Sequence, residues 1–116
     1  MLFDGSHPGN RALKLAADLA IHAGAEIGVL TVDDDAQKGT ATIAEARAYL
    51  DPLGLKAAYA VVPGRPAEAA VAALVKDPAD MVIMGKRGHS PLRHLILGGE
   101  AEQLMRSVEL PVLLVS

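Results

Sequence analysis

Two segments of the sequence carry residues that could hold a ligand. The first is Asp4-Gly5-Ser6, which directly follows a short apolar stretch. A carboxylate at that place can accept hydrogen bonds from ribose hydroxyls or from the amino group of a base, and Gly5 permits a tight turn. The same residues could instead satisfy loop amides or cap a helix. Taken alone, the tripeptide favours the structural role.

The second segment is a glycine-rich, basic stretch over residues 85–99. Its glycines are Gly85, Gly88, Gly98 and Gly99, and its cationic side chains include Lys86, Arg87 and Arg93. The first two glycines allow positive φ and let the backbone approach a phosphate closely. The last two stand where a helix is expected to begin, and the free amides there form an anion site. The stretch is neither a Walker loop nor a dinucleotide fingerprint, and an ordinary connection is an equally good interpretation.

Alternating elements position these two segments. Continuous apolar runs predict buried strands over residues 25–32, 55–62, 81–84 and 112–115, with a short further strand at 1–3. Helical patterns predict helices over residues 10–23, 40–53, 66–76 and 99–108. Strict alternation with short links predicts an α/β fold with a parallel sheet, formed by one domain over residues 1–116. Both ligand-binding candidates then follow strands, at the edge where such sheets bind ligands.

Composition and charge narrow the function classes. The net charge is −3, so no overall positive field attracts nucleic acid or an anionic membrane. Apolar runs fall far short of the ~20 residues that a transmembrane helix needs, and no signal peptide is visible, so we expect a cytoplasmic protein. No cysteine is present.

The sequence predicts neither a metal site nor an efficient catalyst. The four histidines lack metal-ligand spacing; they are His7, His22, His89 and His94. The run Asp33-Asp34-Asp35 could suggest a cation site, but a solvated acidic loop is the better interpretation. No nucleophile is paired with a base, and no metal carboxylates suited to fast phosphoryl transfer are evident.

Gly85-x-x-Gly88, nine residues, then Gly98-Gly99 resembles the nucleotide-loop signature of the universal stress protein family. The likeness extends in order along the whole chain. It includes Phe3-Asp4-Gly5-Ser6, Arg11-Ala12-Leu13, Val62–Ala69, Asp80–Gly88 and Leu110–Val115.

The resemblance implies a five-stranded parallel sheet of order 3-2-1-4-5 with helices on both faces, an adenine-nucleotide alpha-hydrolase-like fold. It implies binding of ATP, or of AMP or ADP, with Mg²⁺ as a companion. It also implies at most slow hydrolysis of bound ATP, and a role in the stress response. It also implies a homodimer paired through Val112–Val115. The implied nucleotide-binding residues are Asp4, Val32, Met84, Gly85, Lys86, Arg87, Gly88, Gly98, Gly99 and Glu100.

Two residues depart from the family pattern. Gly99 replaces the usual Ser or Thr, so a hydroxyl contact to phosphate is lost, and Glu100 places a carboxylate at the next position. Beside a triphosphate that charge is repulsive by about 1 kcal/mol if well solvated. We therefore expect AMP or ADP to be tolerated better than ATP. The alternative is an interaction and dimerisation module of the same fold that binds no nucleotide. The short opening strand leaves open that the chain is half of a tandem protein.

Overall fold

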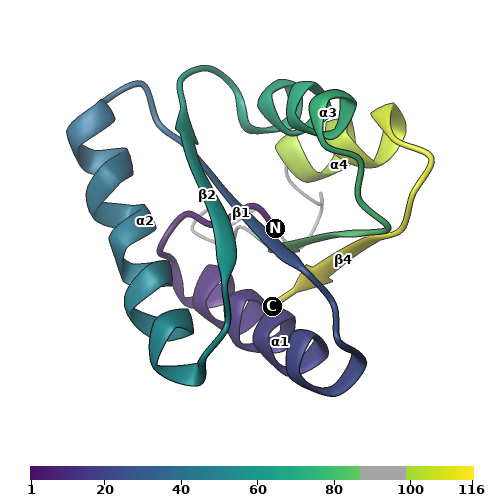
Figure 1. Ribbon diagram of the computed structural model, residues 1–116. Coiled ribbons are helices and arrows are strands. Elements are labelled where there is room, and N and C mark those ends of the chain that lie inside the picture. Colours follow the sequence, from purple (N-terminus) through teal and green to yellow (C-terminus); the bar gives the residue numbers. More distant parts are fainter. Residues whose placement is uncertain (87–98) are drawn as a thin grey trace.

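The computed structural model describes residues 1–86 and 99–116, and it has an α/β architecture (Figure 1). The elements in chain order are α1 (His7–Ala23), β1 (Ile27–Val32), α2 (Ala36–Leu50), the short 3₁₀ helix η1 (Asp51–Leu53), β2 (Ala57–Val62), α3 (Pro66–Lys76), β3 (Val82–Gly85), α4 (Gly99–Ser107) and β4 (Val112–Val115). The predicted α/β fold with parallel strands is confirmed. Among the described residues, no helix has the length and apolar character needed to cross a membrane.

Parallel pairing joins the strands in two pairs. β1 pairs with β2 from Ile27↔Ala57 onward, and β3 pairs with β4 from Val82↔Val112 onward. The two pairs meet at Leu2, which forms parallel bridges to both Leu30 and Met84. The predicted strand at residues 1–3 is thus present only as a single bridge residue. Its neighbours hold it by backbone hydrogen bonds from Leu2 N to Ile83 O (3.0 Å) and from Phe3 N to Leu30 O (2.9 Å).

Helices cover both faces of the sheet, because successive strand residues point to opposite sides. On one face, Phe3 and Val29 pack with Leu13 of α1 and Ile43 of α2. Ile83 of β3 also packs against α1 on that face. On the other face, side chains of β3 and β4 pack against α3 and α4; the buried members are Ala67, Ala70, Val82, Met84, Ala101 and Leu104. Figure 1 shows the same layering, with α1 and α2 apart from α3 and α4.

Helix caps explain where two helices begin. α1 starts at His7 rather than at the predicted residue 10, because Ser6 Oγ accepts a hydrogen bond from Gly9 N (3.1 Å). α2 starts at Ala36 rather than at residue 40, because Asp35 Oδ1 accepts from the amides of Gln37 and Lys38 (3.0 and 3.2 Å). The helix over Pro66–Lys76 has the predicted bounds.

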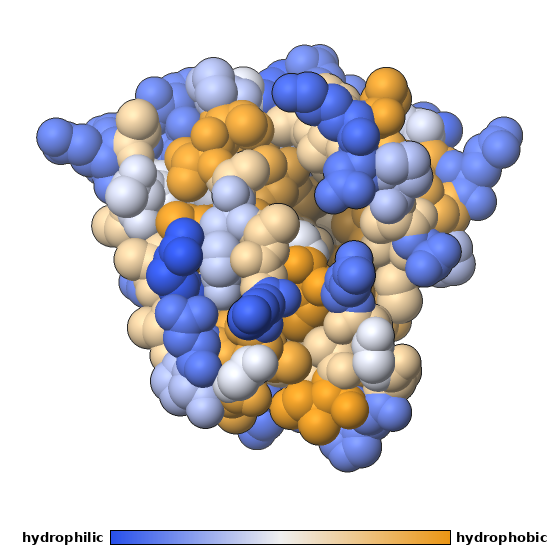
Figure 2. Space-filling view, in the orientation of Figure 1, coloured by the Kyte–Doolittle hydropathy of each residue, from blue (hydrophilic) through white to orange (hydrophobic). Residues whose placement is uncertain are grey.

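Apolar side chains are not fully enclosed. In the orientation of Figure 1 the surface is hollowed near its centre, and apolar residues reach the surface around the hollow (Figure 2). The strands contribute small exposed residues to the surface, namely Gly28, Ala58 and Ala60. A methyl group added at Gly28 would meet nothing within 4 Å.

Candidate functional site

A pocket of about 70 Å³ opens where β1 and β3 reach their carboxyl ends. The elements that line it are the opening segment, the ends of β1 and β3, and the first turns of α3 and α4. The lining residues are Leu2, Phe3, Asp4, Leu30, Val32, Pro66, Met84, Gly85 and Glu100. Ligands bind parallel α/β sheets at this edge, where the winding direction switches. Five of the ten residues implied as nucleotide ligands line this pocket: Asp4, Val32, Met84, Gly85 and Glu100.

Asp4 combines a structural contact with a place in the pocket. Its Oδ1 accepts hydrogen bonds from Ser6 N (3.0 Å) and from Ser6 Oγ (2.5 Å). The same Ser6 hydroxyl caps α1, so the carboxylate orients the cap. The structural role that the tripeptide suggested is therefore real. It does not remove Asp4 from the pocket wall, where the residue remains exposed.

Gly85 serves the packing of α1, which the sequence did not reveal. The described glycines with positive φ are Gly5, Gly24, Gly54 and Gly64, so Gly85 does not adopt the positive φ that a glycine allows. A Cβ on Gly85 would lie 2.5 Å from both Gly9 N and Pro8 C. The first turn of α1 approaches β3 so closely that only glycine fits. The absence of a side chain at Gly85, rather than its backbone freedom, therefore permits this helix contact.

Of the remaining five predicted ligand residues, two are described by the structure and three are not. Lys86 is half-buried and donates its backbone amide to Val115 O (2.7 Å), while Gly99 is exposed and begins α4. A Cβ on Gly99 would meet nothing within 4 Å. Three predicted residues lie outside the described part of the chain: Arg87, Gly88 and Gly98.

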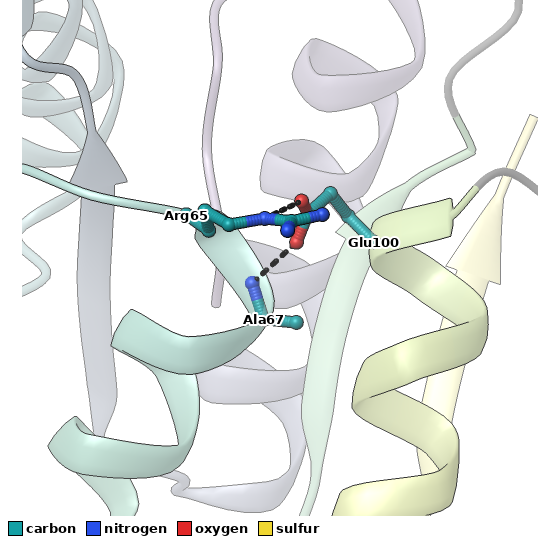
Figure 3. A network of polar contacts seen from close by, with 3 residues as sticks. All are labelled: Arg65, Ala67 and Glu100. Carbon is teal, nitrogen blue, oxygen red and sulfur yellow. Dashed lines mark hydrogen bonds and ion pairs between the residues drawn. The ribbon is translucent and has the colours of Figure 1, made fainter.

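Glu100 is bound to the start of α3 (Figure 3). Its Oε2 accepts a hydrogen bond from Ala67 N (2.8 Å), and its Oε1 lies 3.3 Å from Arg65 Nε. Only 18% of the Glu100 side chain is exposed, against 65% for Arg65. The residue before α3 forms no side-chain cap of its own, so Glu100 of α4 supplies the cap from a neighbouring helix.

Sequence reasoning missed the partners of Glu100. Arg65 and Ala67 precede it by more than thirty residues, and no spacing rule links the two segments. One signal was present: α3 begins at Pro66 without a Ser, Thr, Asp or Asn before it. A helix that starts this way has amides that need a partner from elsewhere.

The acidic run Asp33-Asp34-Asp35 after β1 accepts hydrogen bonds from nearby backbone amides. Asp33 Oδ1 accepts from Asp35 N (2.9 Å), Asp34 Oδ1 accepts from Gly64 N (2.9 Å), and Asp35 caps α2. Each carboxylate thus contacts an amide. In the part of the chain that the structure describes, no group of three or more His, Cys, Asp or Glu side chains could hold a metal ion.

Two ionisable groups with shifted pKa values lie outside the pocket lining. Burial lowers the pKa of the Met1 amine to about 6, and that amine donates a hydrogen bond to Gly28 O. Burial, with Asp51 as a second cause, raises the pKa of the Tyr59 phenol. The Arg47 guanidinium opposes that rise; it stacks over the Tyr59 ring at 4.2 Å from the centroid.

The sequence of this chain is similar to those of known proteins. The sequence pattern of the universal stress protein family matches residues 1–116. Universal stress protein Slr1230 of Synechocystis is 29% identical over 113 residues, which cover 96% of this chain and 39% of that protein. The chain spans less than half of the length of this relative and of the other curated relatives that it matches.

Two solved structures with a bound nucleotide share the architecture over nearly their whole length. A universal stress protein in complex with cAMP aligns at a TM-score of 0.83 with 26% identity, covering all of this chain and 93% of that one. The universal stress protein from Archaeoglobus fulgidus in complex with dAMP aligns at a TM-score of 0.79 with 18% identity, covering 99% and 94%.

Proposed function

Because the chain belongs to the universal stress protein family, we propose that it binds an adenine nucleotide and acts as a regulatory stress protein. The observation that carries the proposal is the pocket at the carboxyl edge of the strands, into which a carboxylate, a strand end and a methionine converge. Related structures with bound cAMP and dAMP support the choice of an adenine nucleotide. In this proposal the protein responds to a ligand and is no efficient catalyst.

Each lining residue has a role in the proposal. Asp4 accepts hydrogen bonds from ribose hydroxyls, the backbone at the end of β1 at Val32 contacts the adenine, and Met84 lies against the base. The flat aromatic base suits an apolar wall, and the hydroxyls need a polar acceptor. Gly85, the last residue of β3, lines the pocket beside them.

The pocket volume limits how much of a ligand it can enclose. Typical pockets for drug-sized ligands measure about 300–1,000 Å³, so 70 Å³ encloses one part of a nucleotide while the rest lies across the open side. We propose that Lys86, Gly99 and the predicted residues outside the described part contact the phosphates. The same proposal includes Mg²⁺ as a companion of the bound nucleotide.

Mass spectrometry of gently purified protein tests the proposal directly. We expect an adenine nucleotide to be released when the protein is denatured, and we expect nucleotide-free protein to show heat on titration with millimolar AMP. Protein that carries no nucleotide and gives no heat with AMP, ADP or ATP would rule the function out.

A pair of isosteric variants locates the site. Asp4→Asn should weaken binding about tenfold or more, because a hydrogen bond to a charged group contributes about 1.5–3 kcal/mol. Asp80→Asn is the matched control, since Asp80 is exposed and precedes β3 at the opposite edge of the sheet. Equal affinity in the two variants would place the ligand elsewhere.

A second candidate function is an interaction module that binds no nucleotide. The contact that favours it is Glu100 held against the start of α3, within the pocket wall. In either case we propose a cytoplasmic homodimer paired through the edge strand Val112–Val115. Sedimentation of the protein in AMP, with the nucleotide followed by its absorbance, separates the candidates: dimers that sediment without AMP favour the module, and dimers that carry AMP with them favour nucleotide binding.

A further inference from the structure

Glu100 belongs to the pocket as well as to the cap of α3. Among the residues that the structure describes, it is one of two carboxylate residues on the pocket wall, the other being Asp4. Its side chain is largely enclosed, and it is held by two contacts, from Ala67 N at 2.8 Å and from Arg65 Nε at 3.3 Å. A carboxylate fixed in this way stays near a ligand that enters the pocket.

The contact also removes an anion-binding group from the site. The amides at the start of a helix attract phosphate because they lack partners. Here Glu100 already accepts from the Ala67 amide, so that N–H is not free for a phosphoryl oxygen. A ligand phosphate therefore meets a negative charge where the helix would otherwise offer a donor.

Among the described residues, the cations Arg65 and Lys86 offset this charge only in part. Arg65 is 65% exposed, so water and salt screen its attraction for a ligand phosphate. Lys86 is half-buried at the end of β3. Each further phosphate adds negative charge near Glu100, and the cost of binding grows with the length of the phosphate chain.

We infer that Glu100 sets the ligand class of the pocket, favouring adenine nucleotides with one phosphate over triphosphates. This rests on the proposed function. Glu100 acts here as a specificity-determining residue, through charge and through its hold on the Ala67 amide.

Isosteric neutralisation of Glu100 tests the inference. Glu100→Gln keeps a carbonyl oxygen that can accept from the Ala67 amide, so the cap survives while the charge is lost. The matched control is Glu102→Gln on the same helical turn, which changes net charge equally; Glu102 is 44% exposed and pairs with Arg106. Adenosine, AMP, ADP and ATP are titrated into each protein by calorimetry, without magnesium, and thermal unfolding verifies the fold.

In the native protein, affinity should fall from AMP through ADP to ATP. In Glu100→Gln the ratio of the ATP dissociation constant to the AMP one should drop by about tenfold, and in Glu102→Gln by less than twofold. An unchanged ratio in Glu100→Gln, or ATP binding as tightly as AMP to the native protein, would overturn the inference and leave nucleotide binding intact. No binding of any of the four ligands to any variant would instead refute the proposed function.

Discussion

Replacing Gly85 by alanine tests whether this glycine serves helix packing. The added Cβ would lie 2.5 Å from Pro8 C and Gly9 N and 2.9 Å from Gly9 Cα, all backbone atoms. The matched control is Gly28→Ala, in another strand of the same sheet, where the added Cβ meets nothing within 4 Å. Neither glycine has positive φ, so the comparison isolates contact from backbone strain.

The distances set the size of the effect. Ordinary contact begins at 3.4 Å, so the first turn of α1 must move away from β3 by 3.4 − 2.5, or 0.9 Å, or else remain strained. Overpacking of this kind costs about 1–3 kcal/mol, and backbone on the far side favours the upper end. Alanine recovers about 0.4–1 kcal/mol by restricting the unfolded chain. We therefore expect Gly85→Ala to lose about 2 kcal/mol, or about 8 °C in Tm.

Urea denaturation followed by circular dichroism measures both variants. Gly28→Ala should match or slightly exceed the native stability. Because Ser6 caps the turn that must move, and Asp4 binds Ser6, Gly85→Ala should also weaken AMP binding. A Gly85→Ala protein as stable as Gly28→Ala would show that α1 does not press on β3 in this way.

Three further predictions concern stability. Leu104→Ala should cost about 3 kcal/mol because Leu104 is fully buried, whereas the exposed neighbour Met105→Ala should change little; equal urea midpoints would contradict this. Tyr59→Phe should be neutral or stabilising by up to about 1 kcal/mol, since the buried hydroxyl has no hydrogen-bond partner among the described residues; a loss above 1 kcal/mol would reveal one. The Met1 amine, with its pKa lowered from 8.0 to about 6, holds fewer protons in the folded state, so stability falls as pH drops from 8 to 6, by about 2 kcal/mol. Extra residues before Met1 should abolish that slope, because the amine becomes a peptide nitrogen; urea unfolding at both pH values measures it.

Local patterns predicted most of the fold. The helix Pro66–Lys76 and the strand Val112–Val115 have the predicted bounds, because proline starts the first and the second is a bounded apolar run. The starts of the first two helices were misplaced, since Ser6 and Asp35 act as caps several residues before the apolar pattern begins. The opening strand was overestimated because a single residue, Leu2, makes the pairing.

Part of the pocket lining was predictable, because several of its residues directly follow strands. Asp4, Val32 and Met84 converge because parallel strands end at the same edge, a property that the alternation of elements already implies. The use of Gly85 could not be predicted, because its contact with α1 depends on how closely two layers approach. The hold of α3 on Glu100 was equally hidden, since it joins segments distant in the sequence.

The joint at Leu2 has a consequence for how the protein opens. Among the described residues, the strand pairs β1–β2 and β3–β4 are connected within the sheet through Met1–Phe3 alone. Regions joined by few backbone bonds can unfold as separate cooperative units with different free energies. Local opening of the sheet should therefore occur mainly where Leu2 joins the two strand pairs. The pocket is lined by residues from both strand pairs. A bound ligand would therefore contact both pairs and slow amide hydrogen exchange in each of them.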